Sequence, residues 1–129
     1  MVASYENVAL FRSRKQTSRI NDMRWSTERR TVAIDNVTIK LTPIQYHLLF
    51  PLRDGVPVTY ADLAYMVYGC AVDDNVRVMM DKHVDRIRGK LRGTGVYIYC
   101  VLGYGYLLFD ERESEEETQD GLYRTRRIL

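Results

Sequence analysis

The sequence is short of several residue types, and each shortage excludes a class of protein. Only two of the 129 residues are cysteines, Cys70 and Cys100, and they match no zinc-ligand spacing. A disulfide-stapled or zinc-centred fold is therefore excluded. We expect both thiols to be reduced and buried, with a regulatory disulfide as the less favoured alternative. No apolar run approaches the ~20 residues that cross a bilayer, so a helical membrane protein is also excluded.

Signals for secretion and catalysis are missing as well. The N-terminus, MVASYENVALFRSRK, lacks the basic-then-apolar order of a signal peptide, which favours a cytoplasmic protein. The two histidines, His47 and His83, have no matched partners in the pattern of a catalytic triad or metal site. No Walker loop is present. We therefore expect no enzymatic activity, no cofactor and no metal.

The net charge is small, but it is distributed unevenly. The chain has 19 basic and 17 acidic residues, for a net charge of +2. Residues 110–129 hold seven acidic and four basic residues, which leaves a net charge of +5 on residues 1–109. A basic body with an acidic tail is compatible with nucleic-acid binding. We divide the chain into an N-terminal arm or extra strand (1–22), a central domain (23–109) and a charged C-terminal tail (110–129).

The central domain begins with a pattern typical of an antiparallel sheet. Strands are expected at residues 23–25, 30–34 and 37–41, where β-branched residues alternate with others. Asp35-Asn36 separates the last two segments. Both residue types tolerate positive φ, so a two-residue primed turn is predicted there.

Three helices are predicted after the sheet. Thr42-Pro43-Ile44-Gln45 combines an N-cap, a proline at the first helical position and a capping-box glutamine, and Asp54-Gly55 is expected to end that helix. A second, short helix is expected between Thr59 and Gly69. The third spans residues 74–92, and its apolar residues form one stripe at helical spacing that faces a core: Val76, Met80, Val84, Ile87 and Leu91.

The rest of the third helix is polar and cationic, and a hairpin follows it. The face opposite the stripe carries Asn75, Val78, Lys82, Asp85, Arg86 and Gly89, and the edges carry Arg77, Arg88, Lys90 and Arg92. On an isolated helix this would indicate a solvated face. Residues 95–101 and 106–109 then predict a hairpin with a Gly103-Tyr104-Gly105 turn. No strand-to-helix unit surrounds these glycines, so they do not indicate a nucleotide-binding loop.

This order of elements is that of a winged helix-turn-helix, an α+β fold with an N-terminal antiparallel sheet, three helices and a C-terminal hairpin wing. Within it, the segments VTIKLTPIQYHLLFPL, TYADLAYMVYG, DKHVDRIRGKL and VLGYGYLL resemble the effector domain of OmpR/PhoB-type response regulators. Leu41-Thr42, Leu48-Leu49, Tyr68-Gly69 and residues 86–91 and 103–106 fill the slots of that family's pattern in order. The resemblance covers about residues 23–109.

The resemblance implies a sequence-specific regulator of transcription that binds double-stranded DNA in the cytoplasm, at the nucleoid. Helix 74–92 would enter the major groove and hairpin 96–109 would be a wing over the minor groove. Base contacts are expected from Val78, Lys82, Asp85 and Arg86. Contacts to the DNA backbone are expected from two groups of residues. The first group is three tyrosines, Tyr68, Tyr104 and Tyr106. The second is four basic residues, which could instead pair with Asp81 or Asp85: Arg77, Arg88, Lys90 and Arg92. Candidate partners besides DNA are a second copy on direct repeats, and RNA polymerase or another regulator; no membrane contact is expected.

Two features depart from the family pattern. Leu102 and Leu107 occupy wing positions where the family usually has arginine. They motivate an alternative function, a winged-helix module for protein–protein interaction or dimerisation with weakened DNA binding. Residues 1–22 cannot hold the receiver domain that normally precedes this one. We therefore expect either a fragment or a stand-alone relative, and the initial Met favours the latter.

Overall fold

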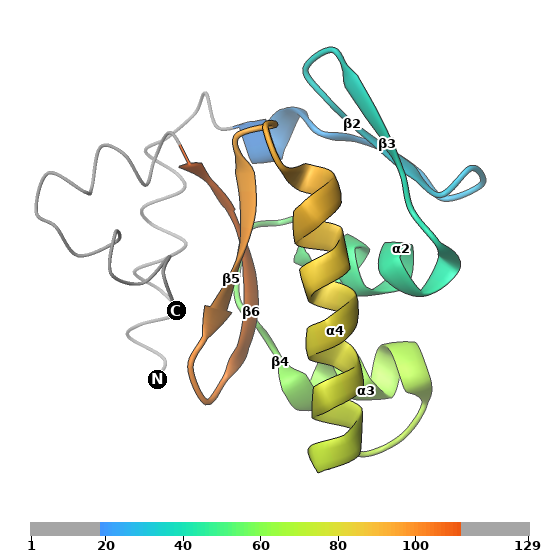
Figure 1. The fold of residues 1–129 in the computed structure, drawn as a ribbon, viewed down its shortest axis with the longest axis vertical. Helices are drawn as coiled ribbons and strands as arrows, with labels where there is room; N and C mark the ends of the chain where they lie inside the picture. Colours follow the sequence, from blue (N-terminus) through green and yellow to red (C-terminus); the bar gives the residue numbers. More distant parts are fainter. Residues whose placement is uncertain (1–18, 112–129) are drawn as a thin grey trace, which may run out of the picture.

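The described part of the chain folds as a small sheet, three α-helices and a second sheet, and one short strand of the second sheet precedes the second of these helices. Figure 1 shows this arrangement in the computed structural model, which describes residues 19–111. The larger part of the predicted arm and most of the predicted tail lie outside the described residues. Residues 19–22, at the end of the predicted arm, form a 3-10 helix, η1 (Arg19–Asp22), whose Ile20 is buried in the core. The predicted α+β winged-helix architecture is confirmed.

The N-terminal sheet follows the predicted pattern closely. It consists of β1 (Arg24–Ser26), β2 (Thr31–Ile34) and β3 (Val37–Lys40), all antiparallel in the order β1-β2-β3. Ile34 pairs with Val37, which leaves the predicted two-residue turn between them. Of the two turn residues only Asp35 has a positive φ, 53°. Positive φ at the first turn residue matches the right-handed twist of the flanking strands.

The first helix begins as predicted but ends early. In α2 (Pro43–Leu49), the Gln45 amide donates to Thr42 Oγ1 and the Thr42 amide donates to Gln45 Oε1, which completes the capping box. The helix was expected to reach Asp54-Gly55. It instead passes into a 3-10 turn, η2 (Phe50–Leu52), because Pro51 has no amide hydrogen and its ring hinders a further α-helical turn.

The other two described helices begin as predicted and end at or within one residue of the predicted position. In α3 (Tyr60–Tyr68), Thr59 caps the start by accepting from the Asp62 amide at 3.0 Å, and Gly69 closes the end at φ 69°. Asp73 caps α4 (Asp74–Leu91), which is one residue shorter than expected. All five residues of the predicted α4 stripe are buried, so the core-facing side is confirmed.

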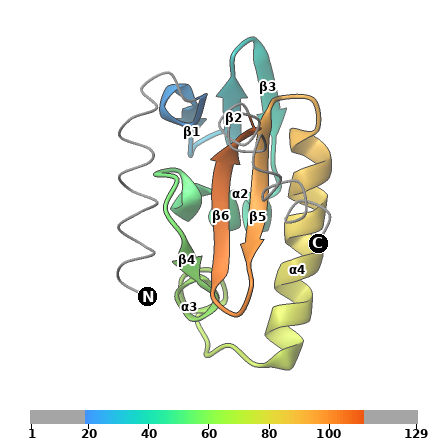
Figure 2. The same ribbon diagram turned by 90° about the vertical axis from the view of Figure 1, so that its left-hand side faces the viewer.

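The wing belongs to a three-stranded sheet rather than a free hairpin. β5 (Val96–Val101) and β6 (Gly105–Asp110) form the predicted hairpin, but Gly105, which was expected in the turn, pairs with Val101 and begins β6. β6 also pairs with β4 (Val58–Thr59), which the sequence pattern did not reveal (Figure 2). β4 approaches so closely that a Cβ atom on Gly105 would lie 1.7 Å from the Val58 carbonyl oxygen. The glycine is therefore required at this position for the strands to pair.

The main core lies between α4, the other helices and the inner faces of both sheets. A second apolar cluster, Tyr99, Leu107 and Phe109, occupies the opposite face of the β5–β6 hairpin. Both cysteines are free and exposed, so the expectation of buried thiols was wrong. Within residues 19–111, no helix combines the length and the apolar character needed to cross a membrane.

Candidate nucleic-acid interface

The wing holds one edge of α4 in place. The Arg88 side chain donates from Nε to the Ile98 carbonyl oxygen at 2.9 Å and from Nη1 to Asp85 at 2.8 Å. About two turns earlier on the helix, Asp81 accepts a hydrogen bond from the Tyr106 hydroxyl. These contacts join α4 to β5 and β6, so the helix and the wing are presented as one rigid unit.

The opposite edge of α4 is held by α2 and β3. Lys90 Nζ donates to the Lys40 carbonyl oxygen at 3.0 Å and to Gln45 Oε1 at 2.7 Å. Gln45 Oε1 also accepts from the Thr42 amide in the capping box of α2. The ammonium group of Lys90 is therefore directed at the protein.

A stacked group anchors the N-terminal half of α4. The Arg77 guanidinium lies 3.6 Å from the centre of the Tyr60 ring, and its buried Nε has no hydrogen-bond partner among the described residues. The Tyr60 hydroxyl lies 3.1 Å from Cys100 Sγ. Burial, followed by this hydrogen bond, raises the pKa of Tyr60 to about 12, so the phenol stays protonated at neutral pH. Arg77 thus supports the junction of α3, α4 and β5 through a cation–π contact.

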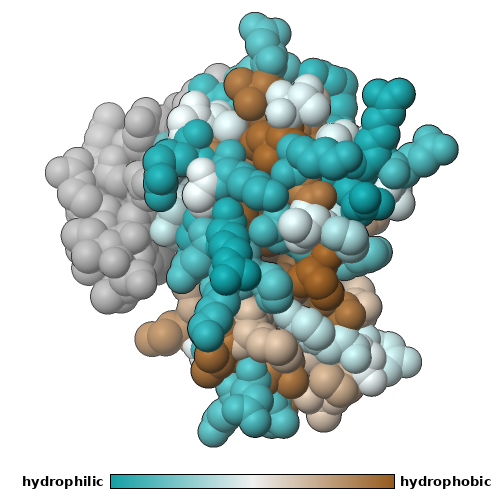
Figure 3. Space-filling view, turned by 45° about the vertical axis from the view of Figure 1, so that its right-hand side comes forward, coloured by the Kyte–Doolittle hydropathy of each residue, from teal (hydrophilic) through white to brown (hydrophobic). Residues whose placement is uncertain are grey.

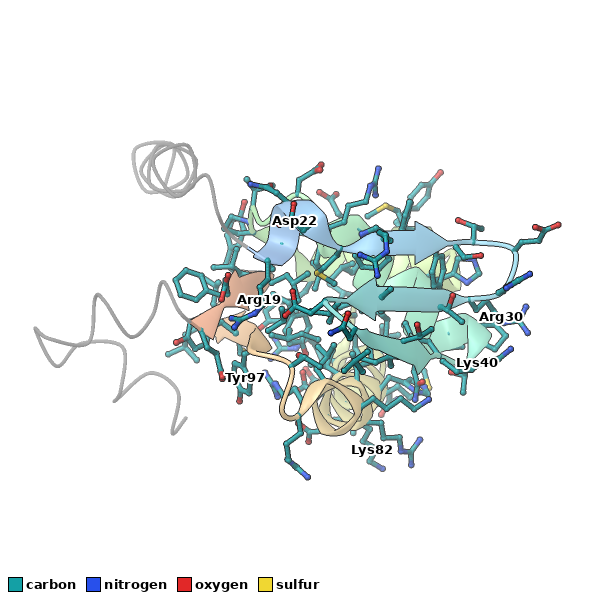
Figure 4. All side chains as sticks on the ribbon, turned by 90° about the horizontal axis from the view of Figure 1, so that it is seen from above. Arg19, Asp22, Arg30, Lys40, Lys82 and Tyr97 are labelled. Atoms are coloured by element: carbon teal, nitrogen blue, oxygen red, sulfur yellow. The ribbon has the colours of Figure 1, made fainter. Side chains whose placement is uncertain are left out.

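The outer face of α4 remains open to solvent. Val78, Lys82 and Arg86 follow one another at intervals of four residues, so they form a single row, and all three are exposed. Within residues 19–111, the side chains of Lys82 and Arg86 make no hydrogen bond or ion pair. Figure 4 shows Lys82 pointing away from the body of the domain. Hydrophilic side chains gather over much of the side drawn in Figure 3, which includes this helix.

The histidine beside this row is kept neutral. Burial, and then the positive charge of Arg86, lower the pKa of His83 below its ordinary value of 6.5. At neutral pH the positive charge of the row is therefore carried by Lys82 and Arg86, Arg92 follows just beyond the end of the helix, and Asp85 pairs with Arg88.

The predicted tyrosines have different surroundings. Tyr106 is only 1% exposed and its hydroxyl donates a hydrogen bond to Asp81, so its position suits it to hold α4 against the wing rather than to contact a ligand. The buried Tyr68 hydroxyl has no partner among the described side chains, and burial raises its pKa. Tyr104 is half-buried in the wing turn, where its carbonyl oxygen accepts from the Tyr60 amide at 2.9 Å.

The two leucines that depart from the family pattern are separated by the structure. Leu102 is 90% exposed at the tip of the wing, whereas Leu107 is 8% exposed within the second apolar cluster. They do not form one exposed patch, because successive side chains of a strand alternate between faces and Leu102 lies in the turn. Only Leu102 is available to a partner.

Sequence reasoning missed the residues that fix the helix edges. Gln45 was recognised as a capping residue, but its bond to Lys90, 45 positions away, has no local signal. Tyr60 and Ile98 were missed for the same reason. Within residues 19–111, no group of histidine, cysteine and acidic side chains could hold a metal ion.

Comparisons with known proteins point to one kind of domain. No protein-family model matches the chain, and no curated protein matches it. Among solved structures, the DNA-binding domain of CpxR from E. coli is 24% identical, with a TM-score of 0.56 over 67% of this chain and 88% of that one.

Two further solved structures are similar. The DNA-binding domain of the response regulator AdeR, in complex with an intercistronic region, is 26% identical, with a TM-score of 0.54 over 68% of this chain and 93% of that one. The DNA-binding domain of Bacillus subtilis CssR is 26% identical, with a TM-score of 0.54 over 67% of this chain and 99% of that one. The fold neighbours are thus DNA-binding domains of OmpR/PhoB-type response regulators.

Proposed function

We propose that this chain, which has the winged helix-turn-helix fold of OmpR/PhoB-type effector domains, is a sequence-specific DNA-binding regulator of transcription. The observation that carries the proposal is the outer row of α4. Lys82 and Arg86 are exposed and make no bond to the described protein, while both edges of the same helix are bonded to its surroundings. A rigid helix with a free cationic face suits the major groove, which is wide enough to admit a helix.

The residues on and around α4 divide into two roles under this proposal. Arg86 reads guanine through a bidentate contact, Lys82 lies one turn away on the same row, and Arg92 lies near a phosphate. Arg88, Lys90 and Tyr106 hold the helix in place, because their donor groups are bonded within the protein. The first role decides which sequence is bound, and the second decides at what angle the helix is presented. A cytoplasmic location and the absence of a catalytic role belong to the same proposal.

A binding-site selection on random duplex DNA, followed by fluorescence anisotropy on the recovered site, tests this function. Lys82→Ala and Arg86→Ala should each weaken binding by roughly 1–3 kcal/mol. Arg24→Ala is the matched control, because Arg24 is an exposed arginine of β1 and donates only to the Asp35 carbonyl oxygen at the surface. The proposal is wrong if the protein binds no duplex at low salt, or if both α4 variants bind as tightly as the control.

A second function is favoured by one observation, the almost complete exposure of Leu102 at the wing tip. An exposed leucine on a turn that is held in place by hydrogen bonds suits contact with a protein, such as a second copy of this chain. Sedimentation at high salt tests this alternative. A dimer that survives salt and dissociates in Leu102→Arg would support it, and a monomer at every salt concentration would oppose it.

A further inference from the structure

The outer face of α4 changes in chemistry along its length. At the C-terminal end of the row stand two cations, Lys82 and Arg86. At the N-terminal end stand Asn75, which is exposed, and Val78, which is 53% exposed. Asn75 and Val78 are three residues apart and therefore neighbours on the helix surface. In Figure 3 brown and tan residues lie among teal ones at the lower end of the molecule, and Figure 1 places α3 and the start of α4 at that end.

The side chains of Asn75 and Val78 take no part in the packing or hydrogen bonding of the fold. Val78 lies outside the buried stripe of α4 and outside both apolar clusters. The Asn75 side chain makes no hydrogen bond within residues 19–111, and Asp73, not Asn75, caps the helix. Their side chains are therefore free to contact a ligand that lies along the outer face.

The major groove offers a partner to each of these side chains. The C5 methyl group of thymine is the apolar feature on a base edge in that groove, and aliphatic side chains contact it. Asparagine suits adenine, because its amide can donate to N7 and accept from N6. Arginine and lysine suit guanine, which presents two acceptors, N7 and O6. The two ends of the row thus match different base pairs.

We propose that α4 reads its DNA site with a fixed polarity, in which Asn75 and Val78 specify A·T pairs and Lys82 and Arg86 specify G·C pairs. This inference rests on the proposed DNA-binding function. Val78 and Arg86 are eight residues apart, which is about 12 Å along a helix at ~1.5 Å per residue. Base pairs are ~3.4 Å apart, so the two determinants are separated by about three to four base pairs.

The test uses the duplex recovered by selection with the wild-type protein. Each thymine is replaced in turn by deoxyuridine, which lacks only the methyl group, and affinity is measured by anisotropy. Replacement of one particular thymine should lower the affinity of the protein for the duplex about fourfold, the factor expected for one buried methyl group. That loss should disappear in Val78→Ser and be reduced in Val78→Thr, which keeps one methyl. Val37→Ser is the matched control, because Val37 is similarly exposed, at 49%, in the N-terminal sheet.

Repeating the selection with variants locates the other determinants. Asn75→Ala should relax an A·T preference at or beside the uracil-sensitive pair, and Arg86→Ala should relax a G·C preference about three to four pairs away. A uracil-insensitive site, or a uracil effect that persists in Val78→Ser, overturns the inference while leaving DNA binding intact. Failure of the wild-type selection to enrich any sequence overturns the proposed function itself, which separates the two failures.

Discussion

The hydroxyl of Tyr106 on β6 donates a hydrogen bond to the carboxylate of Asp81 on α4. Tyr106 is buried, and its ring stands edge-on to that of Tyr60 at a centroid distance of 5.3 Å. One side chain thus connects the wing to the helix proposed to read DNA and to the start of α3. This contact explains how a hairpin can keep a constant position relative to α4.

Tyr106→Phe should lower the free energy of unfolding by about 1–3 kcal/mol, because it removes a buried donor and leaves a carboxylate without its partner. Urea denaturation measures the change. Tyr104→Phe is the matched control, since the Tyr104 hydroxyl makes no hydrogen bond within residues 19–111. Equal stability of the two variants would show that the Tyr106–Asp81 bond does not contribute.

Gly105→Ala should destabilise the protein by about 1–3 kcal/mol, the range for an overpacked site. The added Cβ would lie 1.7 Å from the Val58 carbonyl oxygen, so β4 must move away from β6. Thermal or urea unfolding gives the magnitude.

Gly89→Ala should act oppositely and stabilise the protein by roughly 0.5–1 kcal/mol, because Gly89 is inside α4 and nothing lies within 4 Å of its added Cβ. A destabilised Gly89→Ala would contradict the open surface seen there.

Leu102→Arg should leave the free energy of unfolding unchanged and make DNA binding more dependent on salt. Leu102 is exposed at the wing tip, so an arginine there meets no steric obstacle. If the wing lies over the DNA backbone, one added phosphate contact steepens the slope of log affinity against log salt by about 0.9. Anisotropy titrations between 50 and 200 mM salt, roughly the range in which such slopes are measured, give the comparison. An unchanged slope would place the wing away from the DNA.

Leu107→Arg is the contrasting variant to Leu102→Arg. Leu107 is buried beside Tyr99 and Phe109, so an arginine would place an unpaired charge in an apolar cluster. The variant should unfold at a clearly lower urea concentration than Leu102→Arg. Equal stability of the two arginine variants would mean that the second cluster adds nothing to the fold.

The His83 side chain should make the protein less stable in mild acid. Burial and the Arg86 charge lower its pKa in the folded state below the ordinary value of 6.5. Between the two pKa values the unfolded state binds more protons, so stability falls as pH drops below about 6.5. His83→Gln should flatten that part of the stability curve and leave it unchanged near pH 8. Denaturation at several pH values checks this, and a profile identical to wild type would refute the assignment.

The sequence by itself determined the helices and their ends, because those signals are local. Thr42 and Gln45, Thr59 and Asp62, and Asp73 and Val76 make their capping bonds across three residues, which a linear reading can recognise. The buried stripe of α4 follows from helical periodicity alone. The early end of α2 also has a local cause, because Pro51 is present in the sequence, but the shortening of the helix by this proline was not predicted.

Only the tertiary structure decided which cations of α4 are free. Lys82 and Lys90 are the same residue type on the same helix, yet Lys90 is bonded to the Lys40 carbonyl oxygen, 50 positions away, and Lys82 is open to solvent. The partners of Lys90 and Arg88 come from β3, α2 and β5, and no spacing in the sequence encodes that approach. The same holds for β4, for the exposed cysteines, and for the contrast between Leu102 and Leu107. Each depends on which distant segments pack together, and burial and hydrogen bonding between segments are settled only when the chain has folded.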